Sequence, residues 1–442
     1  MTTHQQLHHL HLRAGFAPSP HEWATLPTDR AAAVERLFQP TVRAEPLTNP
    51  HPSTAEQTQM IPDRKERRKM ERERVLQTTT DWLARMASDE QPALLERMTL
   101  FWHGHFACEC KTGFLAHQYL DTLRRHALGN FRELTLAVAR DPAMIRYLNN
   151  QQNRKQSPNE NFARELLELF TIGRGNYTET DVKEAARAFT GWSSNRTGAF
   201  VFRERQHDFG PKTFFGKTGD WNGDDIVDFV LARPETARFV VRKMYRYFVH
   251  RSVDEQRVEA LARNFRRDYE IAPLLRRMFL ADWFYAPENV GTKIKSPVDL
   301  LVGLMRQLQL TPADNRGTAL LLRALGQTPF RPPNVAGWVG ARAWIDNATL
   351  QTRLNLAAGF GQLLQPEATT NQTTRPRRLR VTADLEPLRA LATPTTEPLT
   401  RYLLAPNLSP DAALIRRAAA RSEDPVLGTA LALMSLPEYQ LS

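Results

Sequence analysis

Hydrophobic residues recur every three to four positions along most of the chain, which is the spacing of amphipathic α-helices. The segment 160–173 shows the pattern clearly. Its apolar positions include Phe162, Leu166 and Phe170, and Gly173 follows where the C-cap of a helix is expected. We therefore predict a mainly α protein, with helices over residues 7–14, 21–24, 30–38, 62–86, 91–105, 116–129, 131–139, 160–172, 178–190, 224–233, 234–248, 254–266, 272–281, 296–308 and 318–325.

A hydrophobic period of two, typical of a β-strand, appears at Ala199–Glu204, and Thr213–Phe215 is the expected return strand. The prediction is a large helical domain over residues 1–364 with one small β-hairpin around residues 199–215. Residues 365–380 are rich in Thr and Gln and predict a flexible linker. Residues 381–442 predict a C-terminal helical segment that packs on the main domain.

Composition narrows the class of protein. Of the 442 residues, 41% are hydrophobic, which is enough to build a large core. The net charge is +11, but the densest basic run, Arg64–Arg74, is interrupted by acidic residues. This pattern favours a solvated helix over a nucleic-acid contact, so nucleic acid is not the expected partner.

Three features of the sequence indicate the cellular compartment in which the protein is expected. No stretch of 18 or more residues is apolar, so no membrane span is expected. The first twelve residues lack the charged and apolar regions of a signal peptide, and we expect a cytoplasmic protein. The only cysteines, Cys108 and Cys110, exclude a disulfide framework.

Two histidines, His103 and His105, lie two residues apart and are followed by the cysteine pair. Four such ligands could hold a thiophilic metal, although the spacing matches no standard zinc module. On a regular helix, positions i and i+2 point about 200° apart and cannot share one ion. The sequence leaves open a metal pair at a frayed helix end, a part in a larger cleft, and buried histidines packed beside Trp102.

The helix predicted over 160–172 carries a dense polar face. Glu160, Asn161, Arg164, Glu165 and Glu168 fall on one arc of about 140° at helical spacing. The face is either a polar stripe lining a cleft or a solvated ladder of ion pairs, each contributing about 0.2–0.5 kcal/mol. Amphipathicity alone does not separate these two interpretations.

A third polar group, His207, Asp208 and Lys212, lies in the predicted turn of the hairpin. A histidine oriented by a carboxylate can act as a general base, whereas a turn can use Asp for its own backbone hydrogen bonds. Further on, Trp338 lies in a segment rich in Pro and Gly, the kind of loop that often lines a binding site. No nucleotide-binding fingerprint appears in the chain.

The order of these motifs resembles the bacterial DUF1800 family, a domain of unknown function. The resemblance runs over nearly the whole chain and is carried by the segments 11–16, 101–106, 159–173, 177–192, 207–212, 295–297, 332–338 and 437–439. It implies a mostly helical protein, often exported, whose gene often lies beside one for a sulfatase-like protein, which is the partner that the resemblance suggests. The family usually lacks the cysteine pair.

The residues and the resemblance together give one hypothesis and one rival. In the hypothesis, the polar groups converge on a single enzymatic cleft. Its catalytic residues are Glu160, Glu165, His207 and Asp208; its ligand-binding residues are Arg164, Lys212, Asn161 and Trp338; and His103 and His105 are the candidate ligands of a divalent metal. In the rival, the polar clusters are buried ion-pair networks of a scaffold protein that binds a partner through the loop Pro333–Trp344.

Overall fold

The structure is a computed structural model that describes residues 1–39, 45–312, 315–364, 381–391, 397–420 and 422–442. The predicted linker, residues 365–380, lies outside the described residues. The mainly α prediction is confirmed. The first half of the chain contains the helices α1 (Thr3–Ala14), α2 (Pro20–Ala24), α3 (Arg30–Phe38), α4 (Thr54–Met60), α5 (Arg64–Ala87), α6 (Ala93–His105), α7 (Gly113–His126), α8 (Phe131–Arg140), α9 (Pro142–Tyr147), α10 (Asn161–Glu165) and α11 (Glu179–Ala188).

The second half continues the helical pattern. Its helices are α12 (Gly223–Ala232), α13 (Pro234–Phe248), α14 (Glu255–Phe265), α15 (Ile271–Leu280), α16 (Pro297–Gln307), α17 (Asn315–Leu325), α18 (Asn347–Leu364), α19 (Glu386–Leu391), α20 (Glu397–Leu403), α21 (Ala412–Ala419) and α22 (Pro425–Met434). Single turns connect them: 3₁₀ turns at Asn150–Gln152, Glu204–Gln206, Asp282–Tyr285, Pro287–Asn289, Ala341–Trp344 and Pro437–Gln440, and a π-helix, η2, at Leu166–Thr171.

The strands are short, antiparallel and paired in twos. The pairs are β1 (Trp192–Ser194) with β2 (Phe200–Phe202), β3 (Lys212–Phe214) with β4 (Lys217–Gly219), and β5 (Leu310–Pro312) with β6 (Val381–Ala383). The pairing differs from the single hairpin expected around residues 199–215. The strand predicted at 199–204 pairs with the segment before it, and the predicted return strand forms a hairpin of its own.

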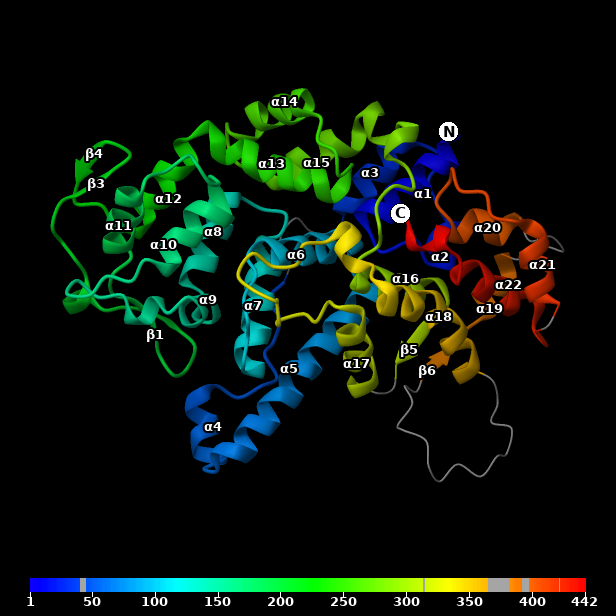
Figure 1. Cartoon of the computed structure of the whole chain (residues 1–442), viewed down its shortest axis with the longest axis horizontal. Coiled ribbons are helices and arrows are strands. Elements are labelled where there is room, and N and C mark those ends of the chain that lie inside the picture. The colour runs from blue at the N-terminus through cyan, green and yellow to red at the C-terminus, as the bar shows by residue number, and fades with distance from the viewer. Residues whose placement is uncertain (40–44, 313–314, 365–380, 392–396, 421) are drawn as a thin grey trace.

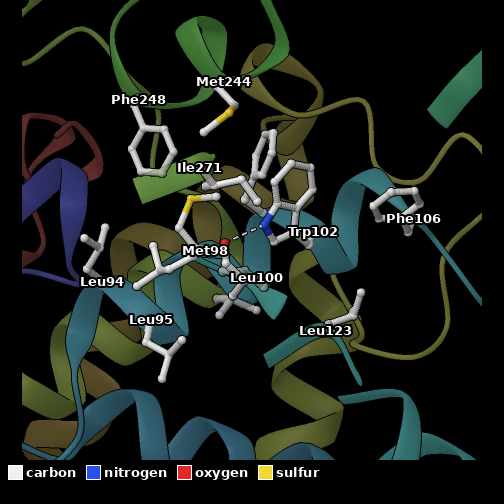
Figure 2. Packing of buried hydrophobic residues seen from close by; sticks show 14 of the residues in the cluster. Leu94, Leu95, Met98, Leu100, Trp102, Phe106, Leu123, Met244, Phe248 and Ile271 are labelled. Carbon is white, nitrogen blue, oxygen red and sulfur yellow. Dashed lines mark hydrogen bonds between the residues drawn. The ribbon is translucent and has the colours of Figure 1, made fainter. Parts of the chain in front are cut away.

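Helix α6 lies in the middle of the molecule beside α7 (Figure 1). Every residue from Leu94 to His105 except Gly104 is buried, as expected for a helix with neighbours on all sides. Figure 2 shows its apolar side chains packed against α7, α13 and α15, with the Trp102 indole inside the cluster. The Trp102 Nε1–H donates to the Ala127 carbonyl at 2.9 Å, so the polar atom of this buried ring is satisfied.

The elements on either side of α6 form two ends of the molecule. Helices α10, α11 and α12 and the hairpin β3–β4 lie at one end, and helices α19–α22 at the other (Figure 1). The C-terminal residues Leu388, Tyr402 and Tyr439 belong to the same hydrophobic cluster as α6. The last residues also pair with the segment before α16, through hydrogen bonds between Lys293 and Ser442. No helix among the described residues is long and apolar enough to cross a membrane.

Candidate functional site

The two histidines of α6 face different parts of the protein. His103 is buried, and its Nε2 accepts a hydrogen bond from the Phe330 N–H at 3.0 Å. Its ring stacks on Trp338, with 5.5 Å between ring centroids. Burial lowers the pKa of His103 to about 3, so the ring is neutral at physiological pH. These contacts make His103 an anchor for the 330–338 loop, and Trp338 stands over it, half-buried.

His105 points toward α10 and η2 instead. Its Nε2–H donates to the Phe170 carbonyl at 2.8 Å, and its Nδ1 is buried and forms no hydrogen bond with any described residue. Because α6 is regular as far as His105, the two rings leave it on opposite sides, and the structure does not bring them together as ligands of one ion. Among the described residues, no group of three or more His, Cys, Asp or Glu side chains is placed to hold a metal.

The polar face of α10 is an ion-pair network at its start. The Arg164 guanidinium donates to Glu160 at 2.9 Å and to both carboxylate oxygens of Glu179, at 2.7 and 2.8 Å. Asn161 is exposed at the beginning of the helix. Glu160 and Arg164 therefore form the first step of the predicted ladder, but Arg164 continues to α11 rather than to Glu168.

The ladder stops because the helix changes type after Glu165. From Leu166 to Thr171 the backbone is π-helical, and the Ile172 N–H bonds to the Leu167 carbonyl five residues back, at 3.1 Å. Lys243 reaches the same turn and donates to the Leu169 carbonyl at 3.1 Å. Single π turns inside helices are rare and often mark functional sites. Glu168 lies within this turn, where it accepts a hydrogen bond from the Tyr177 hydroxyl.

Glu165 and Glu168 are two neighbouring carboxyl groups with different surroundings. Glu168 accepts a hydrogen bond from the Tyr177 hydroxyl at 2.9 Å and forms an ion pair with Arg174. Glu165 is half-buried and makes no hydrogen bond or ion pair with any described residue. Burial, and then the charge of Glu168, raise the pKa of Glu165. Two interacting carboxyl groups whose environments differ in this way are typical of acid–base pairs in enzymes.

Aromatic hydroxyls border this pair. Burial, followed by the hydrogen bond to Glu168, raises the pKa of Tyr177 to about 12, so its hydroxyl remains a donor at neutral pH. Tyr147 lies close enough to Glu165 for that charge to act on it: burial, then the charges of Cys108, Glu109 and Glu165, raise the pKa of Tyr147. We define the carboxyl site as Tyr147, Glu165, Glu168, Arg174 and Tyr177.

The His207 turn is a separate cluster. His207 is buried and its Nδ1–H donates to the Thr190 carbonyl at 2.8 Å. Asp208 accepts from Arg187 at 2.7 Å and from the Gly210 N–H at 2.8 Å. Lys212 is buried and donates to the Gly210 carbonyl at 3.0 Å. His207, Asp208 and Lys212 thus each have a partner within the turn, on α11 or at Thr190, just after α11.

Helix α11 separates this turn from the start of α10. Glu179, which pairs with Arg164, is its first residue, and Arg187, which pairs with Asp208, lies eight residues later. Eight residues of α-helix span about 12 Å. The polar groups that were expected to converge on one cleft therefore occupy two ends of one helix.

The sequence predicted Glu165 as a catalytic residue, but it predicted no such role for the other members of the carboxyl site. Glu168 was predicted only as a member of the polar face of the helix over 160–172, and Tyr177 only as part of a segment that carries the resemblance. The π turn that brings Glu168 to Tyr177 has no signature in the hydrophobic pattern. The one available signal was the spacing of Glu165, Glu168 and Tyr177 around Gly173, whose φ of 79° turns the chain back.

The geometry defines a class: an α-helical protein with a carboxyl pair at the junction of an α- and a π-helix. The chain belongs to the family described as "Protein of unknown function (DUF1800)", whose model matches residues 9–441. Searches of curated proteins and of solved structures gave no match.

Proposed function

We propose that this protein is a hydrolase that cleaves a glycosidic bond by acid–base catalysis at the carboxyl site. The observation that carries the proposal is the unpartnered, half-buried Glu165, with a raised pKa, beside Glu168, which is held by Tyr177 and Arg174. Glycoside hydrolysis uses two carboxyl groups, of which one gives a proton to the leaving oxygen and the other acts as base or nucleophile.

Each group has one step in the proposed reaction. Glu165 gives its proton to the leaving oxygen as the carbon–oxygen bond of the substrate breaks. Glu168 takes a proton from the water whose oxygen forms the new bond to the same carbon. Tyr177 and Arg174 orient Glu168, and Tyr147 borders the pair. After release of the two products, a proton moves from Glu168 to Glu165 through solvent and the site is restored.

The proposed reaction does not use the other candidate site residues, and their functional roles stay predictions. Arg164 and Lys212 were expected to bind an anionic group, and each donates a hydrogen bond to a protein oxygen in the structure. His207 and Asp208 were expected to act as acid and base, and both hold the turn at the end of α11. The hydrogen bonds of His207 and Asp208 support a structural role for this turn.

The rival function, a scaffold that binds a protein partner, has one observation in its favour. Val339 is 91% exposed, next to Trp338 in the loop that contacts His103. A large apolar side chain held out on an anchored loop suits a protein contact. A sulfatase-like protein, suggested by the resemblance, is the first partner to test for this loop.

Glu165→Gln separates the two functions through protein stability. The pKa of Glu165 is raised in the folded state, so its contribution to stability is complete below the ordinary carboxyl pKa and is lost as pH rises through the raised value. Gln is neutral at every pH and avoids this loss. We expect Glu165→Gln to be at least as stable as wild type at pH 8. At pH 4 we expect the stability of the variant, relative to wild type, to be lower than it is at pH 8.

Urea unfolding at both pH values measures this difference. Glu160→Gln is the matched control, because Glu160 lies one turn earlier and forms an ion pair with Arg164. We expect the control to be slightly less stable than wild type at pH 8. A clear loss of stability of Glu165→Gln at pH 8 would place Glu165 in a structural network and favour the scaffold.

A further inference from the structure

A second polar cluster lies on the other side of α6, around the N-terminus of α16. One buried carboxylate, Asp299, interacts there with a set of cationic side chains that are all buried except the half-buried Lys293. The cations are Arg13, Arg97, Lys293, Lys295 and Arg353. No function proposed above uses them, and in Figure 1 α16 and α18 lie apart from α10.

Three of these cations have partners. Arg97 forms an ion pair with Asp299 and donates to the Gly15 carbonyl. Arg13 donates to the Val249 carbonyl at 3.0 Å and to the Asn289 carbonyl. Lys293 lies 3.8 Å from Asp299 and 4.1 Å from the centre of the Tyr247 ring. The single carboxylate is thus already shared by Arg97 and Lys293.

The other two cations and a nearby amide have donor atoms without partners. Lys295 Nζ, Arg353 Nη1 and Gln440 Nε2 are buried and form no hydrogen bond with any described residue. The exposed fractions of these residues are 4%, 0% and 3%. Buried donors of this kind are rare in folded proteins, and those that occur often mark a bound water or ion.

These three donors belong to one structural unit. Arg353 donates through Nη2 to the Lys295 carbonyl and through Nε to Gln440 Oε1, the latter at 3.1 Å. The Lys295 N–H donates to the Gln440 carbonyl at 2.8 Å. Because Gln440 Oε1 accepts from Arg353, the Gln440 amide must present its N–H₂ group to the remaining space.

Among the described residues, Asp299 is the one carboxylate whose charge acts on Lys295. Lys295 Nζ lies 3.7 Å from the centre of the Tyr439 ring, which covers one side of the ammonium group. His8, also buried, has an unpartnered Nε2 and lies close enough to Lys295 for its charge to act on the imidazole. Burial lowers the pKa of Lys295 to about 7, so its charge is poorly compensated by the protein alone.

We propose that Lys295, Arg353 and Gln440 bind one small inorganic anion, chloride or phosphate, inside the protein. Anions accept hydrogen bonds from ammonium, guanidinium and amide N–H₂ groups, and an anion would balance the excess of buried positive charge. The site joins the segment before α16, helix α18 and the C-terminal residues. A bound anion would therefore hold together three parts of the chain that are far apart in sequence.

The test uses the full chain, purified without an affinity tag and exchanged into a gluconate buffer. The protein is denatured and the released chloride and phosphate are measured by ion chromatography. Thermal unfolding is then followed while sodium chloride or sodium phosphate replaces sodium gluconate at constant ionic strength. We expect about one equivalent of a single anion per chain, or a saturable rise of the thermal midpoint by about 2 °C or more with that anion.

Lys295→Met and Gln440→Leu remove one donor each, and Lys69→Met on the exposed face of α5 is the control. Either site variant is expected to lose the released anion and the saturable shift, while the control keeps both. If Lys295→Met does not fold, the released anion and the thermal shift of Gln440→Leu, compared with those of wild type, test the proposal. No released anion and no saturable shift in wild type would overturn the proposal and leave the donors to buried water. A rise of the thermal midpoint with both anions that persists in Lys295→Met and Gln440→Leu would also overturn the proposal.

Discussion

Asp299→Asn is expected to lower the free energy of unfolding by about 3–5 kcal/mol, because it removes the one carboxylate that the buried cations of this cluster share. Asn keeps the size of the side chain and can still accept the Ser296 N–H that Asp299 now accepts at 3.1 Å. The loss would thus report the charge rather than the helix cap. Urea unfolding at pH 7 measures it.

The matched control is Asp282→Asn. Asp282 pairs with Arg30 at 2.8 Å, but its side chain is 93% exposed, and surface pairs contribute about 0–1 kcal/mol. If both variants lost the same small amount, the buried cluster would not depend on Asp299. Neighbouring cations lower the pKa of Asp299 against the effect of burial, so its contribution is present above the ordinary carboxyl pKa and disappears only in strong acid.

Glu165→Gln and Glu168→Gln are each expected to lower the rate of glycoside hydrolysis by about 10²–10⁴-fold, the usual contribution of one general acid or base. The first variant lacks the proton that the leaving group needs. The second lacks the carboxylate that accepts the proton of water. A panel of chromogenic glycosides provides the assay, with the rate of wild type on the best substrate as reference.

The losses of rate in the two variants are expected not to add. Residues that act as one unit give losses that do not add, so the double variant is expected to be little slower than either single one. Glu255→Gln is the control, since Glu255 is exposed and pairs with Arg242 on the surface. Activity that survives in Glu165→Gln at the wild-type rate would contradict the assigned proton donor.

The sequence predicted those parts of the fold that depend on local pattern. The predicted helix over 91–105 is α6 within two residues, and the predicted helix over 178–190 is α11 within two residues. Strand pairing was less predictable, because strands of three residues carry too little alternation to choose a partner. The segment around Phe200 pairs backward to Trp192 rather than forward.

The candidate site was predictable only in part, for a similar reason. Glu165 could be found because it lies on the polar face of an amphipathic helix. Its environment could not, because the π turn and the partner Tyr177 depend on tertiary packing. The buried cation cluster could not be predicted, since Arg13 lies nearly 290 residues before Asp299 and Arg353 more than 50 residues after it, and each resembles an ordinary surface charge in sequence.

The protonation of Glu165 is the central claim, and its titration is the most direct test. Carbon-13 NMR of the side-chain carboxyl of labelled glutamate, with Glu165→Gln to assign the signal, follows that proton between pH 3 and pH 9. We predict a midpoint above 4.5, the ordinary value for a glutamate. A midpoint at or below 4.5 would show that its surroundings do not favour the protonated form of Glu165, and would contradict its role as the proton donor.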